Sequence, residues 1–215
     1  MKKYDYILFD LDGTISDSEL GITSCVQYAL QHLGIEVEDR STLRCFIGPP
    51  LLDTFMREFD LNRQQAEEAV AKYRERYAVI GMFENEIYPG IDSLLEELKL
   101  QGKVLATASS KPEKYVKLIL EHFGLDGYFD EIAGAELAVD GRNSKEDVLR
   151  YVISRLGVED LDSAVLVGDT KFDVEGAKEL GIDCIGVTYG FGTAAELKDC
   201  VAVADTTAEL KAILC

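Results

Sequence analysis

Asp10 and Asp12 are the residues whose type and spacing most directly suggest chemistry. They stand two positions apart in Phe9-Asp10-Leu11-Asp12-Gly13-Thr14, immediately after a short apolar run. In an extended segment this spacing lets both side chains leave the same face, and the following Gly13 permits a sharp turn. Two like charges held this close are costly unless a cation or a shared proton relieves them. An Asp-Gly turn with a local hydrogen bond is the alternative interpretation, so the pair needs support from other residues.

A second acidic pair, Asp169 and Asp173, follows another apolar run in Val165-Leu166-Val167-Gly168-Asp169-Thr170-Lys171-Phe172-Asp173. The two carboxylates are separated by about one helical turn. Hard oxygen ligands from two separate strands suit magnesium, which keeps several waters and accepts a phosphate oxygen. The alternative is that these acids only complement the dipole of the helix that they begin.

A hydroxyl and an ammonium group complete the set of candidates. Ser109, in Thr107-Ala108-Ser109-Ser110-Lys111-Pro112, comes just past an apolar run. It could donate a hydrogen bond to a phosphoryl oxygen beside a helix N-terminus, although these serines could simply cap that helix. Lys145 begins another helix, where a cation is locally unfavourable. Its place is explained if it neutralises both a phosphate and a nucleophile; a solvated surface lysine is the alternative.

The elements around these residues predict an α/β fold. After a first strand at Tyr4–Phe9, and again after Tyr88-Pro89-Gly90, short apolar runs indicate strands, and in the second part they alternate with amphipathic helices. This rhythm is typical of a buried, mostly parallel, doubly wound sheet. Ligands of such sheets sit at the carboxyl ends of the strands. The expected order is helix Ile91–Gln101, strand Lys103–Thr107, helix Glu113–Phe123, strand Phe129–Ala133, helix Lys145–Leu156, strand Ala164–Val167, helix Val174–Leu180 and strand Asp183–Val187, with short elements near Ala194–Leu197, Val201–Val203 and Thr207–Leu214.

From about Ser18 to Ile80 the signals are helical instead. Apolar residues recur at spacings of three and four on both sides of the loop Gly48-Pro49-Pro50, and Asn62 is a plausible N-cap. We expect this block to be inserted after the first strand as a separate small lobe. The predicted division places residues 1–14 and 90–215 in the core and residues 15–89 in the insert.

Composition narrows the class of protein. The chain has 215 residues, of which 47% are hydrophobic, and a net charge of -18 from 22 basic and 40 acidic residues. So acidic a surface disfavours nucleic-acid polymers, but local cations can still admit a small phosphorylated substrate. No apolar run reaches the length of a membrane span or signal peptide, so we expect a cytoplasmic protein with no membrane partner. Five widely spaced cysteines indicate reduced thiols.

The four catalytic segments, in this order, resemble the motifs of the haloacid dehalogenase superfamily over essentially the whole chain. Asp10-Leu11-Asp12-Gly13-Thr14 resembles its first motif, Ser109 the second-motif hydroxyl, Lys145 the third-motif cation, and Gly168 through Asp173 the fourth motif. Thr107 is the alternative hydroxyl and Lys111 the alternative cation. The resemblance implies a Rossmann-like core with an inserted α-helical cap of the C1 type.

Within that subclass, the chain resembles phosphoglycolate phosphatases and bacterial 5′-nucleotidase-like phosphatases. The segments that resemble the nucleotidase-like group most are Phe46-Ile47-Gly48-Pro49-Pro50-Leu51, Phe83-Glu84-Asn85 and Ile132-Ala133-Gly134-Ala135. One departure is the stretch from Glu136 to Gly141, which is longer than is usual before the third motif.

The resemblance implies a magnesium-dependent phosphomonoester hydrolase acting on a small phosphorylated metabolite, such as a nucleoside monophosphate or a phosphoglycolate-like ester. Asp10 would attack phosphorus and Asp12 would serve as acid and then base. Magnesium would be held by the Asp10 carboxylate, the Asp12 backbone carbonyl and Asp169. Further implied roles are phosphoryl binding by Ser109 and Lys145, water-mediated metal binding or support of Lys145 by Asp173, and substrate contacts by Ser110, Arg44, Gly48 and Pro49.

Other functions stay open at this point. Asp12 argues against dehalogenation, because a departing halide needs no proton. A phosphomutase of the β-phosphoglucomutase type needs the same core residues. From another class, a phosphoryl-accepting receiver-like module also combines acids, a hydroxyl and a lysine on a parallel sheet. An inactive binding protein on the same fold is disfavoured, because every core role is filled. The sequence names neither the phosphate ester nor the oligomeric state.

Overall fold

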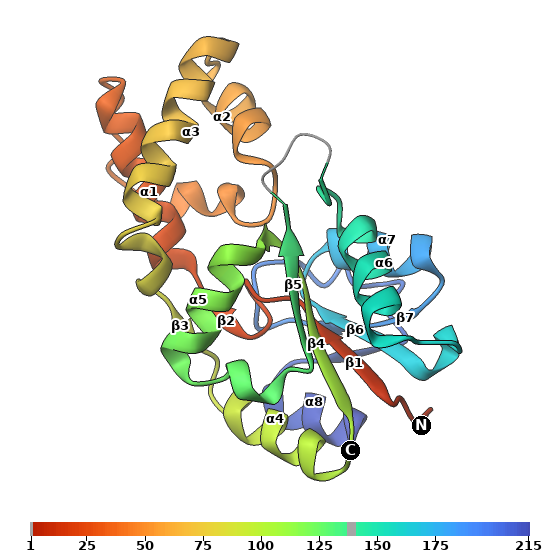
Figure 1. Ribbon diagram of the computed structural model, residues 1–215. Helices are drawn as coiled ribbons and strands as arrows, with labels where there is room; N and C mark the ends of the chain where they lie inside the picture. Colours follow the sequence, from red (N-terminus) through yellow and green to blue (C-terminus); the bar gives the residue numbers. More distant parts are fainter. Residues whose placement is uncertain (1, 137–140) are drawn as a thin grey trace. The chain divides into compact units, whose positions relative to one another are not determined.

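A six-stranded, fully parallel sheet forms the centre of the larger part of the chain (Figure 1). The structure is a computed structural model that describes residues 2–136 and 141–215. The strands lie in the order β5-β4-β1-β6-β7-β8. Their bounds are β1 Tyr6–Phe9, β4 Val104–Pro112, β5 Glu131–Ala135, β6 Ala164–Gly168, β7 Asp183–Val187 and β8 Ala202–Ala204. This arrangement confirms the predicted Rossmann-like, doubly wound fold.

Helices cover both faces of this sheet, with α4 and α5 on one side and α6 and α7 on the other (Figure 1). The helices of this unit are α4 Ile91–Leu100, α5 Glu113–Phe123, α6 Lys145–Leu156, α7 Lys171–Leu180 and α8 Thr207–Leu214, with short 3₁₀ helices η3 Asp126–Tyr128 and η4 Leu161–Ser163. From β1 the chain crosses through α4 to β4 on one side of β1, and from β5 it crosses back through α6 to β6 on the other side of β1. Ligands of doubly wound sheets bind at such a switch point, which lies here at the end of β1.

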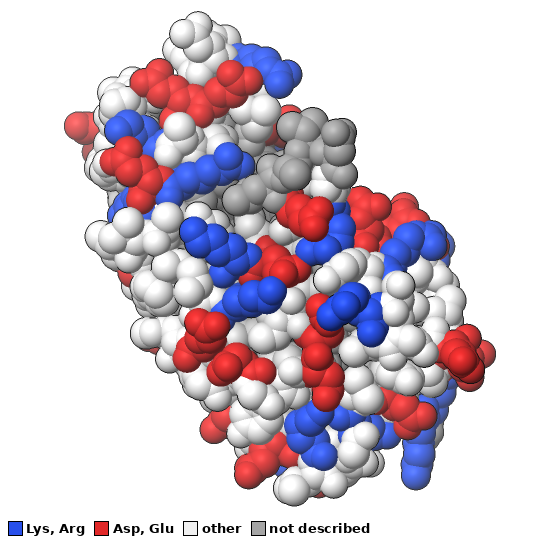
Figure 2. Space-filling view, viewed as in Figure 1, with Lys and Arg blue, Asp and Glu red and all other residues white. Residues whose placement is uncertain are grey.

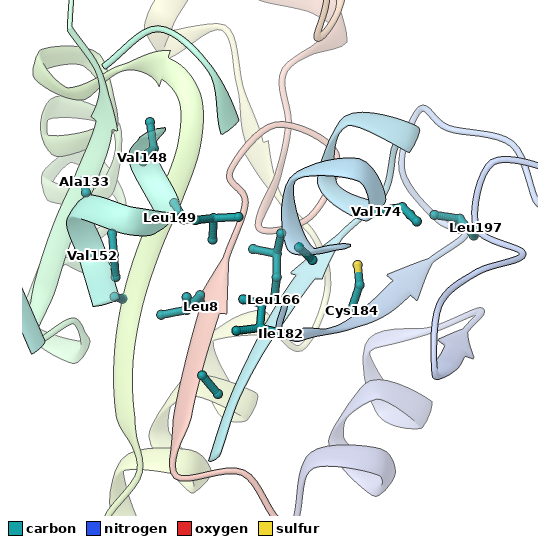
Figure 3. Packing of buried hydrophobic residues seen from close by; sticks show 14 residues of the cluster. Leu8, Ala133, Val148, Leu149, Val152, Leu166, Val174, Ile182, Cys184 and Leu197 are labelled. Carbon is teal, nitrogen blue, oxygen red and sulfur yellow. The ribbon is translucent and has the colours of Figure 1, made fainter. Parts of the chain in front are cut away.

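Strand β1 is buried on both faces, as a central parallel strand must be. On the face covered by α6 and α7, Leu8 and Leu166 pack against Val148, Leu149 and other apolar side chains of these helices (Figure 3). Leu8, Leu166, Val148 and Leu149 are fully buried. The ends of β1 and β6 are therefore fixed by a close-packed core, which positions the residues that follow each strand.

A fixed helix start places Lys145 at the first residue of α6. The side chain of Ser144 accepts a hydrogen bond from the Asp147 amide at 3.1 Å, and the Asp147 carboxylate accepts one from the Ser144 amide at 3.2 Å. This reciprocal arrangement is a capping box, which satisfies amides that the helix itself cannot. The lysine is therefore presented from a rigid helix end rather than from a loop.

The chain divides into two compact units, one of residues 1–16 and 87–215 and the other of residues 17–86. The second unit is helical, and its long helices α1 and α3 pack against each other. Asn62 caps α3 by accepting a hydrogen bond from the Gln65 amide at 3.0 Å, as its position indicates. The elements between the first strand and α4 are β2 Ser16–Asp17, α1 Glu19–His32, η1 Arg40–Phe46, α2 Leu51–Phe59, α3 Arg63–Tyr77, η2 Gly81–Phe83 and β3 Glu86–Ile87.

Several predicted boundaries are wrong, each for a local reason. β4 continues beyond Thr107 to Pro112 because it carries an irregularity that keeps it paired with β5. β5 begins at Glu131 and not at Phe129, because the Phe129 amide donates to the Asp126 carbonyl and so ends η3. Residues Ala194–Leu197 form turns instead of a short regular element. The expected long stretch from Glu136 to Gly141 falls largely on residues 137–140, outside the described residues.

On the face shown in Figure 2, basic and acidic side chains are interspersed rather than gathered by sign. No helix in residues 2–136 and 141–215 combines the length and apolar character that crossing a membrane requires.

Candidate active site

Three buried carboxylates meet where β1 and β6 end. Asp10 directly follows β1, Asp169 directly follows β6, and Asp173 lies in the first turn of α7. One oxygen from each lies within 4.8 Å of the others. Asp169 and Asp173 have no exposed surface. The sequence placed these acids at the ends of strands, and the fold brings them into one cluster.

Lys145 is buried beside this cluster and contacts two of its members. Its Nζ lies 2.9 Å from Asp10 Oδ1 and 2.8 Å from Asp173 Oδ1, and it donates to the Ala108 carbonyl at 2.9 Å. Two ion pairs and one hydrogen bond therefore anchor the ammonium group on three sides. Lys145 is therefore held against Asp10, where its charge offsets part of the negative charge of the cluster.

Burial and mutual repulsion shift the ionisation of the cluster. Burial raises the pKa of Asp10 to about 6, helped by the charges of Asp173 and Asp12 and opposed by Lys145. Burial also raises the pKa of Asp169, and the nearby Asp173 and Asp10 add to the effect. For Lys145, burial lowers the pKa, but attraction by Asp10 and Asp173 outweighs it, so the net shift is upward. The cluster therefore carries unfavourable negative charge that a further cation would relieve.

Asp12 faces a different partner from Asp10. Its Oδ2 lies 2.5 Å from Lys111 Nζ, and both side chains are largely buried. Gly13 follows with φ of +85°, and a Cβ there would come within 2.1 Å of Asp169 Oδ2. A side chain at position 13 would thus be strained and would collide with the cluster. The turn at Gly13 explains the Asp-x-Asp-Gly pattern, because the chain must leave the strand sharply and pass close to Asp169.

The geometry distinguishes the two candidate hydroxyls. Thr107 Oγ1 donates to the Ala133 carbonyl at 2.9 Å and accepts from the Ala133 amide at 2.9 Å, so it belongs to the buried link between β4 and β5. Ser109 lies at the carboxyl end of the sheet, where its Oγ accepts from the Lys111 amide at 3.2 Å. Its hydroxyl proton is left for another acceptor. The arrangement favours Ser109 over Thr107 as the hydroxyl that could bind a phosphoryl oxygen. Ser110 is exposed.

Asp173 both caps the start of α7 and contacts Lys145. Its Oδ2 accepts hydrogen bonds from the amide and the hydroxyl of Thr170, at 3.0 and 2.9 Å, which caps the start of α7. Its Oδ1 contacts Lys145. The capping contacts fix the carboxylate, and the carboxylate in turn fixes the lysine.

A loop after β7 contributes contacts that the sequence reading missed. The Phe191 amide donates to Asp169 Oδ2 at 2.7 Å, and the Tyr189 hydroxyl donates to the Thr14 carbonyl at 3.1 Å. The available signal was Tyr189-Gly190-Phe191-Gly192 directly beyond a strand, where two glycines allow backbone to approach a site closely. This loop therefore helps to hold the Asp169 carboxylate in place.

The residues present fit a divalent cation. Within the described parts of the chain, Asp169 Oδ1 is buried and lacks a hydrogen-bond partner, which is costly for an ionised carboxylate. Carboxylate oxygens are the ligands that magnesium prefers. Asp169 and Asp10 could bind such an ion directly, with Asp173 in reach.

The expected substrate contacts Arg44, Gly48 and Pro49 lie in the second unit. Arg44 forms an ion pair with Glu19 at 2.7 Å within that unit, and its side chain is 61% exposed. Gly48 has a φ of +100°, which marks a turn before Pro49. Their contribution to substrate binding stays a prediction.

Thr107→Val tests the assignment of the hydroxyls. The replacement leaves the Ala133 amide and carbonyl without their side-chain partner in the buried sheet, so we expect a loss of about 1–3 kcal/mol in the free energy of unfolding. Catalytic activity of the folded variant should be retained. Ser109→Ala should lower activity and should cost less stability than Thr107→Val, because it removes one hydrogen bond, from the Lys111 amide, instead of two. Urea unfolding and phosphatase assays measure the two effects. A Thr107→Val protein that is stable but inactive would reverse the assignment.

Known proteins share this sequence pattern and fold. The pattern of the haloacid dehalogenase-like hydrolases matches residues 7–187. A 5′-nucleotidase of Pseudomonas aeruginosa is 44% identical over 197 residues, which cover 91% of this chain and 88% of that protein. The tyrosine-protein kinase PtkA of Mycobacterium tuberculosis is 41% identical over 189 residues, covering 87% of this chain but 63% of the longer PtkA.

The fold of this chain is also similar to that of a solved structure. The crystal structure of a predicted phosphatase from Clostridium acetobutylicum has a TM-score of 0.90 and 44% identity, with 98% of each chain covered. The family expected from the four motifs is thereby confirmed, and the receiver-like alternative falls away. The chain belongs to the haloacid dehalogenase-like hydrolases, among the phosphatases of that family.

Proposed function

We propose that the protein is a magnesium-dependent phosphomonoester hydrolase that works through an aspartyl-phosphate on Asp10. The observation that carries this proposal is the buried contact of Asp10 with Lys145, 2.9 Å apart, inside a cluster of carboxylates. A buried carboxylate beside a fixed cation suits attack on a phosphoryl group, because the cation offsets repulsion between two anions. Asp12, two residues further along the chain, contacts Lys111 instead. We assign the proton transfers of the reaction to Asp12.

In the first step, a carboxylate oxygen of Asp10 forms a bond to phosphorus. The bond from phosphorus to the ester oxygen breaks, and that oxygen takes a proton from the Asp12 carboxyl group. The products of this half-reaction are an alcohol and an acyl phosphate on Asp10.

In the second step, a water oxygen attacks the same phosphorus and gives a proton to Asp12. The bond between the Asp10 oxygen and phosphorus breaks, which releases inorganic phosphate and restores both aspartates to their starting forms. Lys145 and the Ser109 hydroxyl hold the phosphoryl oxygens throughout, where charge shifts in both transition states.

Magnesium, when bound by Asp10 and Asp169, would neutralise phosphoryl charge and hold the phosphate in line with the nucleophile. The unpartnered, buried Asp169 Oδ1 supports this assignment, as does the upward shift in the pKa of Asp169. The Phe191 amide keeps the other oxygen of Asp169 in place. The Asp12 backbone carbonyl is the third proposed ligand.

For the substrate we propose a nucleoside 5′-monophosphate, with a phosphoglycolate-like ester as the alternative. The 44% identity to a 5′-nucleotidase over nearly the whole chain supports this order. The second unit, with Arg44 and the Gly48-Pro49 turn, is the proposed cap that reads the part of the substrate beyond the phosphate.

Asp10→Asn tests the covalent mechanism. We expect kcat for an aryl phosphate to fall by at least about 10⁴-fold, because the nucleophile is lost, while the far-ultraviolet circular dichroism stays unchanged. Asp162→Asn is the matched control, because the side chain of Asp162 is 83% exposed. Retained hydrolysis by the Asp10 variant would exclude the aspartyl-phosphate.

Magnesium should stabilise the metal-free protein against heat. At a concentration about 100 times its Kd, the gain is about 2.7 kcal/mol, and in a chain of this size that raises Tm by roughly 5–10 °C. Asp169→Asn should abolish this rise without lowering the Tm of the metal-free protein, because it removes a buried charge. Asp162→Asn should keep the full rise, measured by differential scanning calorimetry. An equal rise in the Asp169 variant would place the ion elsewhere.

A substrate panel tests the proposed specificity. We expect kcat/KM for a nucleoside 5′-monophosphate to exceed that for phosphoglycolate and for hexose phosphates by at least about tenfold, the discrimination that one additional binding contact can supply. Isomerisation of a hexose phosphate in the presence of a bisphosphate activator would instead identify a phosphomutase.

A further inference from the structure

The contact between Lys111 and Asp12 is a second buried ion pair beside the carboxylate cluster. The two charged atoms are 2.5 Å apart, and the side chains are 6% and 14% exposed. Lys111 lies near the end of β4, whereas Asp12 lies beyond β1, so the pair joins two neighbouring strand ends. A lysine withdrawn this far from water needs a partner, and Asp12 supplies it.

An irregularity in β4 aims Lys111 at this position. Ser109 pairs with Gly134 of β5, but the next paired residue is Pro112, opposite Ala135, so β4 contains additional residues at this point. Such bulges redirect side chains and are frequent next to active sites. Ser109 Oγ accepts from the Lys111 amide, which fixes the irregular backbone. A Cβ at Gly134 would lie 2.4 Å from the Lys111 carbonyl oxygen, so this packing requires a glycine there.

The two buried lysines divide their contacts between the two aspartates of the Asp10-Leu11-Asp12 segment. Lys145 forms ion pairs with Asp10 and Asp173 and donates a hydrogen bond to the Ala108 carbonyl. Lys111 contacts Asp12. Each of the two aspartates is therefore in contact with a lysine of its own.

We propose that Lys111 is a positioning residue that orients the Asp12 carboxylate for proton transfer, and that Asp12 loses its working geometry without it. This proposal rests on the two-step mechanism proposed above. Lys111 would act through Asp12 and not through the phosphate. Proton transfer requires the acid or base within hydrogen-bond reach of the reacting oxygen, so the direction of the Asp12 side chain controls its effect.

The two half-reactions depend on Asp12 to different degrees, which separates this role from a general loss of structure. With 2,4-dinitrophenyl phosphate the departing oxygen leaves as a stable anion, so formation of the acyl phosphate needs no proton from Asp12. Attack by water on the acyl phosphate still needs Asp12 as the base. With an alkyl phosphate, the first half-reaction also needs Asp12, because an alkoxide is a poor leaving group.

Lys111→Met, with Lys117→Met as the matched control, tests the proposal in rapid-mixing experiments. For the dinitrophenyl ester we expect a burst of about one equivalent of dinitrophenolate, followed by a steady-state rate reduced about 10²-fold, the lower end of acid–base contributions. For an alkyl phosphate we expect no burst and at least the same reduction in kcat. Lys111→Arg, which keeps the charge, should restore part of the steady-state rate. Lys117 is a half-exposed residue paired with Glu113, and its variant should match the parent protein.

Unchanged kinetics of Lys111→Met with both esters would overturn the proposal. An equal loss of burst and steady-state rates would also overturn it, because it would indicate that Lys111 binds the phosphate. The parent protein and Asp10→Asn separate these outcomes from failure of the proposed function. If the parent forms no acyl phosphate, or if Asp10→Asn gives the same burst, the two-step mechanism itself is wrong.

Discussion

The repulsion among buried carboxylates is the constraint on which the rest of this site depends. Oxygens of Asp10, Asp169 and Asp173 lie within 4.8 Å of one another, in surroundings that exclude water from Asp169 and Asp173. Removing such charges from water is expensive unless they are paired. Lys145 contacts two of the three, so negative charge remains in the cluster. A phosphatase that binds a metal ion can use this state, since the same repulsion creates a demand for a divalent cation.

Such a cluster can exist only if the surrounding backbone is rigid. The ends of β1 and β6 are fixed by fully buried side chains such as Leu8 and Leu166. The capped start of α6 holds Lys145, and contacts with Thr170 hold Asp173. Repulsion alone would drive the carboxylates apart, and it is this packed framework that keeps them together. The stability of the core is in this sense a condition for the chemistry at its edge.

The sequence predicts the helices and strands and part of the candidate site. It does not predict the contacts that form only when distant segments meet. Hydrophobic periodicity is local, so helices such as Lys145–Leu156 and Glu113–Phe123 were predicted with their observed bounds. Thr107 and Ser109 have the same alternation and cannot be separated in this way. The hydrogen bonds of Thr107 with Ala133 separate them, and these depend on strand pairing. The Phe191 amide contact to Asp169 likewise depends on a loop more than 20 residues away.

Asp10 and Asp12 have different surroundings, and this difference also depends on contacts between distant segments. Strand alternation places residues two apart on one face, which would give both carboxylates the same environment. The turn at Gly13 and the irregularity of β4 separate them instead, with Asp10 against Lys145 and Asp12 against Lys111. Two carboxyl groups can act as nucleophile and as acid or base only if their surroundings differ. The separation is therefore produced by tertiary structure, acting on a motif whose two acids are alike in sequence.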